Sequence, residues 1–263
     1  MKPGEASQTA RRVAAHRLGF PRIPWAQGRP EDDEALQADV ATGVTIDAGS
    51  LIGRYLRART GFFDRVVVDA IEGGVPQAVA VGAGYDGRSL RYAAPGVRWF
   101  ELDHPDTQAD KRARLARLDL DADDVGFAPA DFLLDDVVAA LGAAGHDATR
   151  PALFTCEGVA GYLPVDTLER LVRSLADAAA PGSRLAMTIA VDPGDVRAGI
   201  DRGMLAAAVA GMGEALSSSL PRRHLFGFFA DAGWDIERAV DPLGEPILSS
   251  TRNSAFVLAA PAT

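Results

Sequence analysis

Residues 79–88 of the sequence, VAVGAGYDGR, are the stretch that best predicts the fold of this chain. A short apolar run, 77–81, leads directly into a glycine-rich turn, and a segment of helical character follows. A turn of this kind between a strand and a helix points its backbone amides at the carboxyl edge of a parallel sheet, where such folds bind their ligands. The stretch therefore predicts an α/β fold and also the place of its ligand.

Apolar runs that alternate with stretches of helical period follow this loop along the chain. Short, continuous apolar runs are typical of strands that are buried on both faces of a parallel sheet. Right-handed crossover helices between such strands give a doubly wound sheet. We expect strands over 77–81, 97–102, 125–128, 152–156 and 184–190, with helices over 86–92, 105–119, 133–144 and 166–179.

Two strand-like runs, 234–240 and 254–258, follow without a helix between them. Strands joined in this way should pair antiparallel. We therefore predict an α/β fold of the class I methyltransferase (Rossmann-like) type. It has a seven-stranded sheet that is mostly parallel and ends in an antiparallel hairpin, and this hairpin separates it from most dinucleotide-binding folds.

Two segments lie outside this repeating unit. Residues 1–74 have the apolar spacing of helices, and we expect a helical N-terminal cap over the ligand side of a binding domain formed by residues 75–263. Residues 196–223, which are rich in Ala, Gly and Met, form the predicted helical insertion after the fifth strand. This insertion would suit a substrate lid, and a plain packed helix is the alternative.

Composition limits the partners of the chain. With 263 residues, of which 48% are hydrophobic, a large core can be buried. The formal charge of −9 disfavours nucleic acid, and Cys156, the single cysteine, excludes an intrachain disulfide and a cysteine-based zinc cluster. Neither a signal peptide nor a run of about 20 apolar residues is present. We expect a cytoplasmic protein that binds a small molecule, with no metal, no nucleic acid and no membrane.

The glycine loop fits two kinds of cofactor. Gly82, Gly84 and Gly87 match the pattern G-x-G-x-x-G, which suggests NAD as readily as S-adenosylmethionine. Asp86 lies within the loop, where its carboxylate would repel a pyrophosphate and would stabilise an ammonium or a sulfonium. This charge predicts S-adenosylmethionine, with S-adenosylhomocysteine as the product. Asp86 can also cap the helix that follows, and the two roles are compatible.

Acidic residues stand at the ends of three further predicted strands. Asp103 lies roughly 20 residues beyond the first glycine, where a carboxylate can accept hydrogen bonds from a ribose diol, and Glu101 is the alternative. Asp131 and Phe132 stand where adenine would lie, the first to accept from its amine and the second to pack on its ring. Glu157 faces either the charged methionine end of the cofactor, the substrate or a helix N-terminus.

Four separated motifs resemble those of the leucine carboxyl methyltransferase family. They are residues 59–64 (RTGFFD), 79–88 (VAVGAGYDGR), 100–111 (FELDHPDTQADK) and 156–164 (CEGVAGYLP). That family includes many bacterial O-methyltransferases of secondary metabolism and the protein-phosphatase carboxyl methyltransferases. The resemblance covers residues 11 to about 181. It departs from the family pattern at Gly87, where the family usually has a hydroxyl residue.

The resemblance implies a methyltransferase that uses S-adenosylmethionine, and it adds arginines to the candidate site. In the family, an arginine in the position of Arg59 and a basic residue resembling Arg11 bind the methionine carboxylate; Arg12 and Arg17 are the alternatives to Arg11. Guanidinium groups can bind a carboxylate through two parallel hydrogen bonds. By the same resemblance, the cofactor contacts would include Gly82, Asp103, Asp131, Phe132 and Glu157.

The methyl acceptor decides whether a general base is needed. A carboxylate is already an anion at neutral pH, whereas a phenol or an alcohol benefits from a base. Tyr162 and His224 are the candidate catalytic residues, although His224 can equally belong to an exposed basic patch. We expect an O-methyltransferase acting on a carboxylate or hydroxyl of a small metabolite, for example a polyketide. A non-methylating S-adenosylmethionine-binding protein and an NAD-dependent oxidoreductase are the alternatives.

Overall fold

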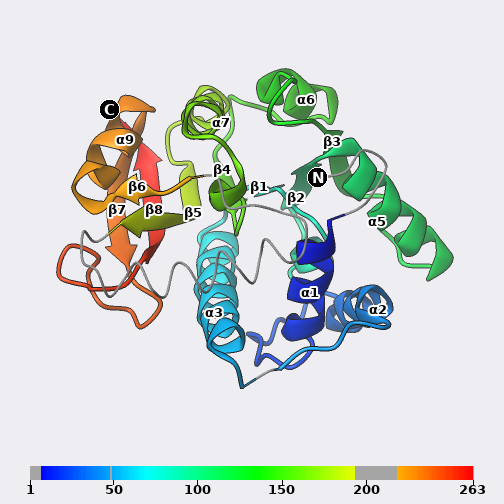
Figure 1. Ribbon diagram of the computed structural model, residues 1–263. Coiled ribbons are helices and arrows are strands. Elements are labelled where there is room, and N and C mark those ends of the chain that lie inside the picture. Colours follow the sequence, from blue (N-terminus) through cyan, green and yellow to red (C-terminus); the bar gives the residue numbers. More distant parts are fainter. Residues whose placement is uncertain (1–6, 48, 193–217, 263) are drawn as a thin grey trace.

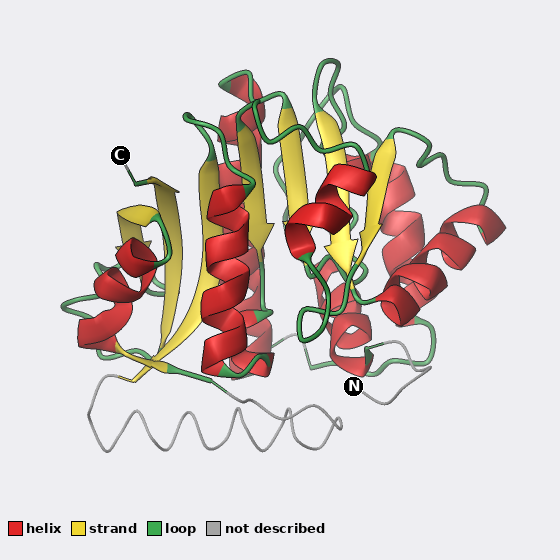
Figure 2. Ribbon diagram, turned by 90° about the horizontal axis from the view of Figure 1, so that it is seen from above, coloured by secondary structure: helices red, strands yellow, loops and turns green. Residues whose placement is uncertain are grey.

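The computed structural model describes residues 7–47, 49–192 and 218–262 of the chain. Its centre is a mixed sheet with helices on both faces (Figures 1 and 2). The strands follow the order β3-β2-β1-β4-β5-β8-β7, and a short strand, β6, pairs with β5 outside this path. The predicted α/β fold is confirmed.

The strands lie close to their predicted positions. Strands β1 to β5 pair in parallel, whereas β8 is antiparallel to both β5 and β7, as predicted for the last two strands. The sheet has eight strands and not seven, because β6 pairs with the end of β5 through two residues inside the segment expected to be an insertion. The strands are β1 (Gln77–Val81), β2 (Arg98–Asp103), β3 (Val125–Pro129), β4 (Ala152–Cys156), β5 (Arg184–Asp192), β6 (Leu220–Pro221), β7 (Trp234–Val240) and β8 (Ser254–Pro261).

The helices differ more from the prediction. Helix α6 begins four residues later than expected, because the Asp136 side chain accepts a hydrogen bond from Ala139 N and caps it, after a turn closed by Asp131. Helix α4 is a single turn, and α9 was not expected. The helices are α1 (Gln8–Arg17), α2 (Pro30–Ala41), α3 (Leu51–Glu72), α4 (Arg88–Arg91), α5 (Pro105–Arg117), α6 (Val137–Ala143), α7 (Val165–Asp177) and α9 (Leu225–Asp231), with 3-10 turns η1 (Ala160–Tyr162) and η2 (Arg222–His224).

Alternate residues of the central strands pack into opposite layers. Val79 and Phe154 belong to one core cluster together with apolar residues of α6, α7 and α9. Their neighbours Ala78 and Leu153 belong to another, which contains the end of α3. Each strand is therefore buried on both faces, which explains why the sequence shows continuous apolar runs and no polar alternation.

The three N-terminal helices pack beside the glycine loop. Ala14 of α1 and Leu36 of α2 share a core cluster with Tyr85 of that loop. Ser7 and Ser50 cap α1 and α3 through their hydroxyl oxygens. The division into a cap, 1–74, and a binding domain, 75–263, stays a prediction. The expected insertion, 196–223, lies outside the described residues except for 218–223.

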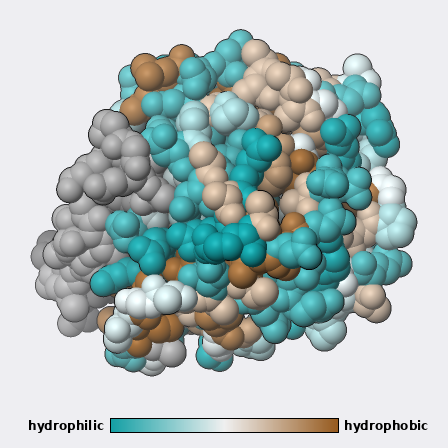
Figure 3. Space-filling model, turned by 90° about the vertical axis from the view of Figure 1, so that its right-hand side faces the viewer, coloured by the Kyte–Doolittle hydropathy of each residue, from teal (hydrophilic) through white to brown (hydrophobic). Residues whose placement is uncertain are grey.

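The surface around α2 and α5 is mostly hydrophilic. The space-filling view of this side shows apolar atoms in separate areas among polar ones (Figure 3). In the part of the chain that the structure describes, no helix combines the length and the apolar character that crossing a membrane requires.

Candidate cofactor and active site

A cavity of about 500 Å³ lies at the carboxyl edge of the sheet. Its wall combines the glycine loop, the segments that follow β2, β3 and β4, and residues of α1 and α3. A parallel sheet of this kind binds its ligand at such a place. Nine of the predicted site residues line the cavity: Arg59, Gly82, Gly84, Asp86, Asp103, Asp131, Phe132, Glu157 and Tyr162.

Two predicted residues, Arg11 and His224, do not line the cavity. The guanidinium group of Arg11 donates to the carbonyl oxygens of Val40 and Thr42 at the end of α2, at 3.4 and 3.2 Å. His224 is exposed in η2 beside Arg223, as expected for a basic surface patch. Arg17, one of the alternatives to Arg11, does line the cavity: the two lie about 1.7 helical turns apart, so they point to different sides of α1.

The glycine loop is shaped by close neighbours. Gly82 and Gly84 have φ angles of +65° and +51°, which favour glycine. A Cβ atom on Gly82 would lie 2.2 Å from Cγ2 of Val159, and one on Gly84 would lie 3.1 Å from Cβ of Ala10. The loop therefore has room for neither side chain, and α1 and the segment after β4 approach it closely.

Asp103 is the acidic residue that reaches the cavity at the end of β2. Its carboxylate accepts hydrogen bonds from Gly84 N and from His104 N, the latter at 2.7 Å. Burial raises the pKa of Asp103 to about 6, although both hydrogen bonds favour the ionised form. Glu101, the alternative, does not line the cavity, because Lys111 binds its carboxylate at 2.6 Å beneath the loop.

The turn after β3 forms the wall next to Asp103. Asp131 and Phe132 both line the cavity there, and Oδ1 of Asp131 accepts from Leu133 N at 2.9 Å. His104 also lines the cavity, with its Nε2 3.9 Å from Oδ2 of Asp131. Sequence reasoning missed His104, although its place directly after Asp103 could have indicated it. These side chains offer an acceptor and a ring face to a planar group.

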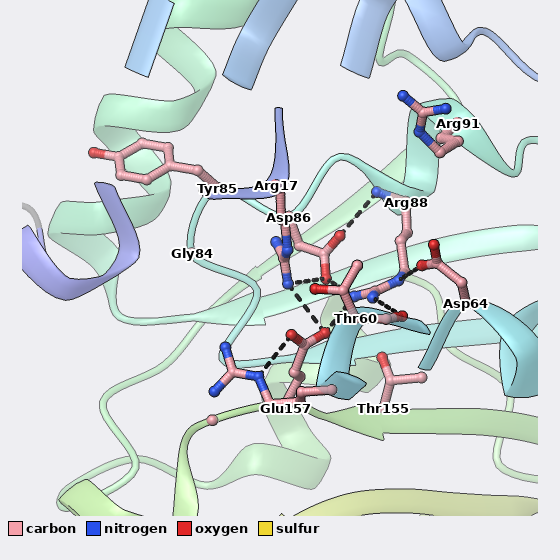
Figure 4. Close-up of polar contacts among 12 residues, drawn as sticks. Arg17, Thr60, Asp64, Gly84, Tyr85, Asp86, Arg88, Arg91, Thr155 and Glu157 are labelled. Carbon is pink, nitrogen blue, oxygen red and sulfur yellow. Dashed lines mark hydrogen bonds and ion pairs between the residues drawn. The ribbon is translucent and has the colours of Figure 1, made fainter. Parts of the chain in front are cut away.

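Glu157 is surrounded by three arginines. Its Oε1 lies 2.9 Å from Nε of Arg59, and its Oε2 lies 3.0 Å from Nη2 of Arg17 and 2.5 Å from Nη1 of Arg88. In Figure 4 the side chains of Arg17 and Arg88 converge on this carboxylate. Burial opposes ionisation, but the three guanidinium groups hold the pKa of Glu157 well below its usual range. Glu157 therefore stays ionised and is only a weak base near neutral pH.

Asp86 lies in the same charged cluster. Its Oδ2 is 2.5 Å from Nη1 of Arg88 and 3.3 Å from Nη2 of Arg17, and its Oδ1 accepts from the backbone N of Arg88, the first residue of α4, at 3.0 Å. Despite burial, these arginines hold the pKa of Asp86 below its usual range. The charge that was expected to choose between NAD and S-adenosylmethionine is thus neutralised within the protein. The choice therefore cannot rest on Asp86. Helix α4 begins at Arg88 with Gly87 as its N-cap, so Asp86 lies one residue before the capping position expected for it.

The cavity has a buried donor that fits a carboxylate. Nε of Arg17 is buried and has no hydrogen-bond partner among the described residues. Arg59 lies nearby on α3, and a Cβ atom on Gly158 would lie 2.6 Å from its Nη1, so glycine is needed for this approach. An amino-acid carboxylate placed here would receive charge-assisted hydrogen bonds. The residues present therefore fit the methionine end of S-adenosylmethionine.

The segment that follows β4 completes the wall of the cavity. Tyr162 of η1 lines the cavity, and Ser218 donates through its hydroxyl to Ala160 O at 2.7 Å. The turn before η1 is held by Gly158 N, which donates to Oγ1 of Thr188 at 2.8 Å. Within residues 7–47, 49–192 and 218–262, no group of His, Cys, Asp or Glu side chains is arranged to hold a metal ion.

Comparisons with known proteins agree with this architecture. Residues 14–176 match the model of the leucine carboxyl methyltransferase family. A protein of Mycobacterium avium (strain 104), named as an S-adenosyl-L-methionine-dependent methyltransferase, is 38% identical over 173 residues, which are 62% of this chain and 53% of that protein. A protein of Mycobacterium bovis (strain BCG / Pasteur 1173P2) with the same name is 33% identical over 220 residues, 80% of this chain and 70% of that protein.

A solved structure shares the fold. The crystal structure of a DUF574 family protein from Streptomyces avermitilis MA-4680 superposes with a TM-score of 0.62 at 18% identity, and 98% of each chain is covered. The chain spans about half the length of the first relative and 70% of the second. The family match, the relatives and the fold together lead to one conclusion: the chain belongs to the leucine carboxyl methyltransferase family of S-adenosylmethionine-dependent methyltransferases.

Proposed function

We propose that the protein methylates an oxygen atom of a small metabolite and that this oxygen belongs to a carboxylate. The observation that carries the proposal is the state of the two acids at the methionine end of the cavity. Glu157 and Asp86 are both held ionised by arginines, at 2.5 to 3.3 Å. Their lowered pKa values make both of them weak bases toward a hydroxyl group, whereas a carboxylate acceptor needs no base.

Different residues of the cavity would bind different parts of the cofactor. Asp103 would accept from the ribose hydroxyls, and Asp131 and Phe132 would hold the adenine. Arg17 and Arg59 would bind the methionine carboxylate, Arg17 through the Nε atom that has no partner within the described residues. Bound S-adenosylmethionine supplies a methyl carbon that is activated by its sulfonium.

The role of the protein in the transfer is alignment and exclusion of water. The acceptor carboxylate oxygen forms a bond to the methyl carbon while the carbon–sulfur bond breaks, so the products are a methyl ester and S-adenosylhomocysteine. No proton is transferred in this step. Tyr162 of η1, which lines the cavity, would donate a hydrogen bond that orients the acceptor.

Matched acceptor pairs test the proposal. The purified protein would be incubated with S-adenosylmethionine and with pairs such as phenylacetate and 2-phenylethanol, or octanoate and octanol. The product S-adenosylhomocysteine would be measured by mass spectrometry. We expect product from acids and none from the paired alcohols, at a rate that changes little between pH 7 and 9, because the acceptor is ionised throughout. Turnover of alcohols or phenols alone, increasing with pH, would contradict the proposal.

A further inference from the structure

A buried lysine that does not line the cavity holds the glycine loop. Lys111 of α5 is 1% exposed, and its Nζ donates to the carbonyl oxygen of Asp86 at 2.5 Å and to Oε2 of Glu101 at 2.6 Å. Glu101 of β2 is 2% exposed, and its Oε1 accepts from Oγ of Ser89 at 2.7 Å. None of these three side chains lines the cavity.

Such a pair contributes little to the stability of a fold. Removing two charges from water costs several kcal/mol per ion, and an apolar pair of similar volume is often as stable or more stable. The pair does fix the positions of its neighbours, because the buried ammonium group of Lys111 must be satisfied by a fixed set of acceptors. One of those acceptors is a backbone carbonyl of the glycine loop itself.

The position of this carbonyl makes the contact important for the loop. At its start, the loop is held by Gly82 N, which donates to Leu102 O at 2.7 Å, and by Gly84 N, which donates to Asp103. At its other end, Lys111 holds Asp86 through the carbonyl oxygen. The loop is thus fixed at one end to β2, which ends with Asp103, and at the other end to α5, which begins two residues later.

We propose that Lys111 is a positioning residue for the cofactor: by holding the Asp86 carbonyl, it keeps the loop from Gly82 to Asp86 in the shape that binds S-adenosylmethionine. The proposal rests on the cofactor site described above. Its mechanism is separate from the fold's stability, because the contact with Asp86 O orients the loop whereas the contact with Glu101 balances charge.

Three variants separate these two contacts: Lys111→Met, Glu101→Gln and the double variant. Each would be measured for its free energy of unfolding and for the Kd of S-adenosylhomocysteine by calorimetry. Glu101→Gln keeps the lysine and its bond to Asp86 O, so we expect its Kd within about threefold of the wild type. Lys111→Met should weaken binding tenfold or more, the scale of one hydrogen bond from a charged group.

The double variant is decisive. It leaves no lone buried charge, so its stability should recover relative to Lys111→Met, while its Kd stays about tenfold or more above the wild type because Asp86 O still lacks its donor. Recovery of affinity together with stability would overturn the proposal, and so would wild-type affinity in Lys111→Met.

Asp103→Ala in the same titrations tests the cofactor site independently. If this variant binds S-adenosylhomocysteine as tightly as the wild type, the proposed site is wrong, and the positioning role of Lys111 fails with it. If Asp103→Ala loses binding while Lys111→Met keeps it, only the role of Lys111 is overturned.

Discussion

Gly87 and the carboxylate of Asp33 occupy adjoining space so tightly that a Cβ atom on Gly87 would lie 1.9 Å from Oδ1 of Asp33. Asp33 belongs to α2 and is 1% exposed, with Arg91 at 2.5 Å and Arg22 at 3.2 Å from its Oδ2. The resemblance to the family had singled out Gly87 as a departure from a hydroxyl residue. The structure supplies the reason: an acidic side chain from another helix fills that space.

Restoring the family's hydroxyl residue should therefore destabilise this protein. We expect Gly87→Thr to lower the free energy of unfolding by about 2–4 kcal/mol, because Asp33 must move away from its two arginines. Urea unfolding would measure the change. Gly61→Ala on α3 is the matched control, since no atom lies within 4 Å of its Cβ position, and it should be neutral or slightly stabilising. A stable Gly87→Thr variant would show that Asp33 can be displaced at little cost.

Cofactor affinity should decrease as the pH falls through about 6. Burial raises the pKa of Asp103 to about 6, and only the ionised carboxylate can accept from both ribose hydroxyls. Affinity is therefore highest above this pH and about tenfold weaker at pH 5. Titration calorimetry with S-adenosylhomocysteine in buffers of different ionisation enthalpy should detect proton release near pH 6. In a His104→Asn variant, which keeps a side-chain acceptor at the start of α5, the same dependence should remain; its loss would assign the effect to His104.

Arg17 should contribute to affinity only through the methionine end of the cofactor. Arg17→Gln is expected to raise the Kd of S-adenosylhomocysteine by about 10- to 100-fold, the range for a hydrogen bond to a charged group. Methylthioadenosine, which lacks the amino-acid part, should bind wild type and variant alike. Arg11→Gln is the control on the other side of α1 and should change neither value. An equal loss of affinity for both ligands would show that Arg17 does not act through the amino-acid part of the cofactor.

Acid should destabilise the core at His146. This ring lies between Phe100 and Phe154, and burial lowers its pKa although Asp147 acts in the opposite direction. The unfolded chain then binds more protons than the folded one, so stability is complete above about pH 6.5 and is lost as the pH falls below it. His146→Leu should reduce the difference in unfolding free energy between pH 7.5 and 5.5. An unchanged difference would mean that other groups account for it.

The sequence predicted best where one local signal was sufficient. Strands β1 and β4 begin and end where their apolar runs do, because a strand buried on both faces admits few polar residues. Helix α6 was predicted too long, since the apolar residues Leu133 and Leu134 continue its pattern into a turn where they are exposed. Capping by Asp136, and not hydropathy, sets the start of that helix.

The sequence predicted where the residues of the candidate site lie but did not predict the ion pairs that they form. The sequence placed Asp86 and Glu157 at the correct edge of the sheet, but their partner Arg17 lies 69 residues before the first of them and well outside any local motif. Similarly, Glu101 looked like a ribose ligand because its counter-ion, Lys111, belongs to a different element. The pairing of Arg17 with these acids depends on the packing of α1, which no local pattern contains, and the pairing of Lys111 with Glu101 depends on how α5 folds back on β2.

The order of the strands has a consequence for how the chain reaches this structure. Strand β8 follows β7 in the sequence but lies between β5 and β7 in the sheet. Among the described strands, β7 pairs only with β8, so it joins the sheet together with β8 or after it. Strands β1 to β5 have no such requirement and can assemble earlier. Docking of β8 is thus a late step across a long stretch of chain, where closure is slow, and β7 and β8 should be the last strands to gain amide protection during refolding.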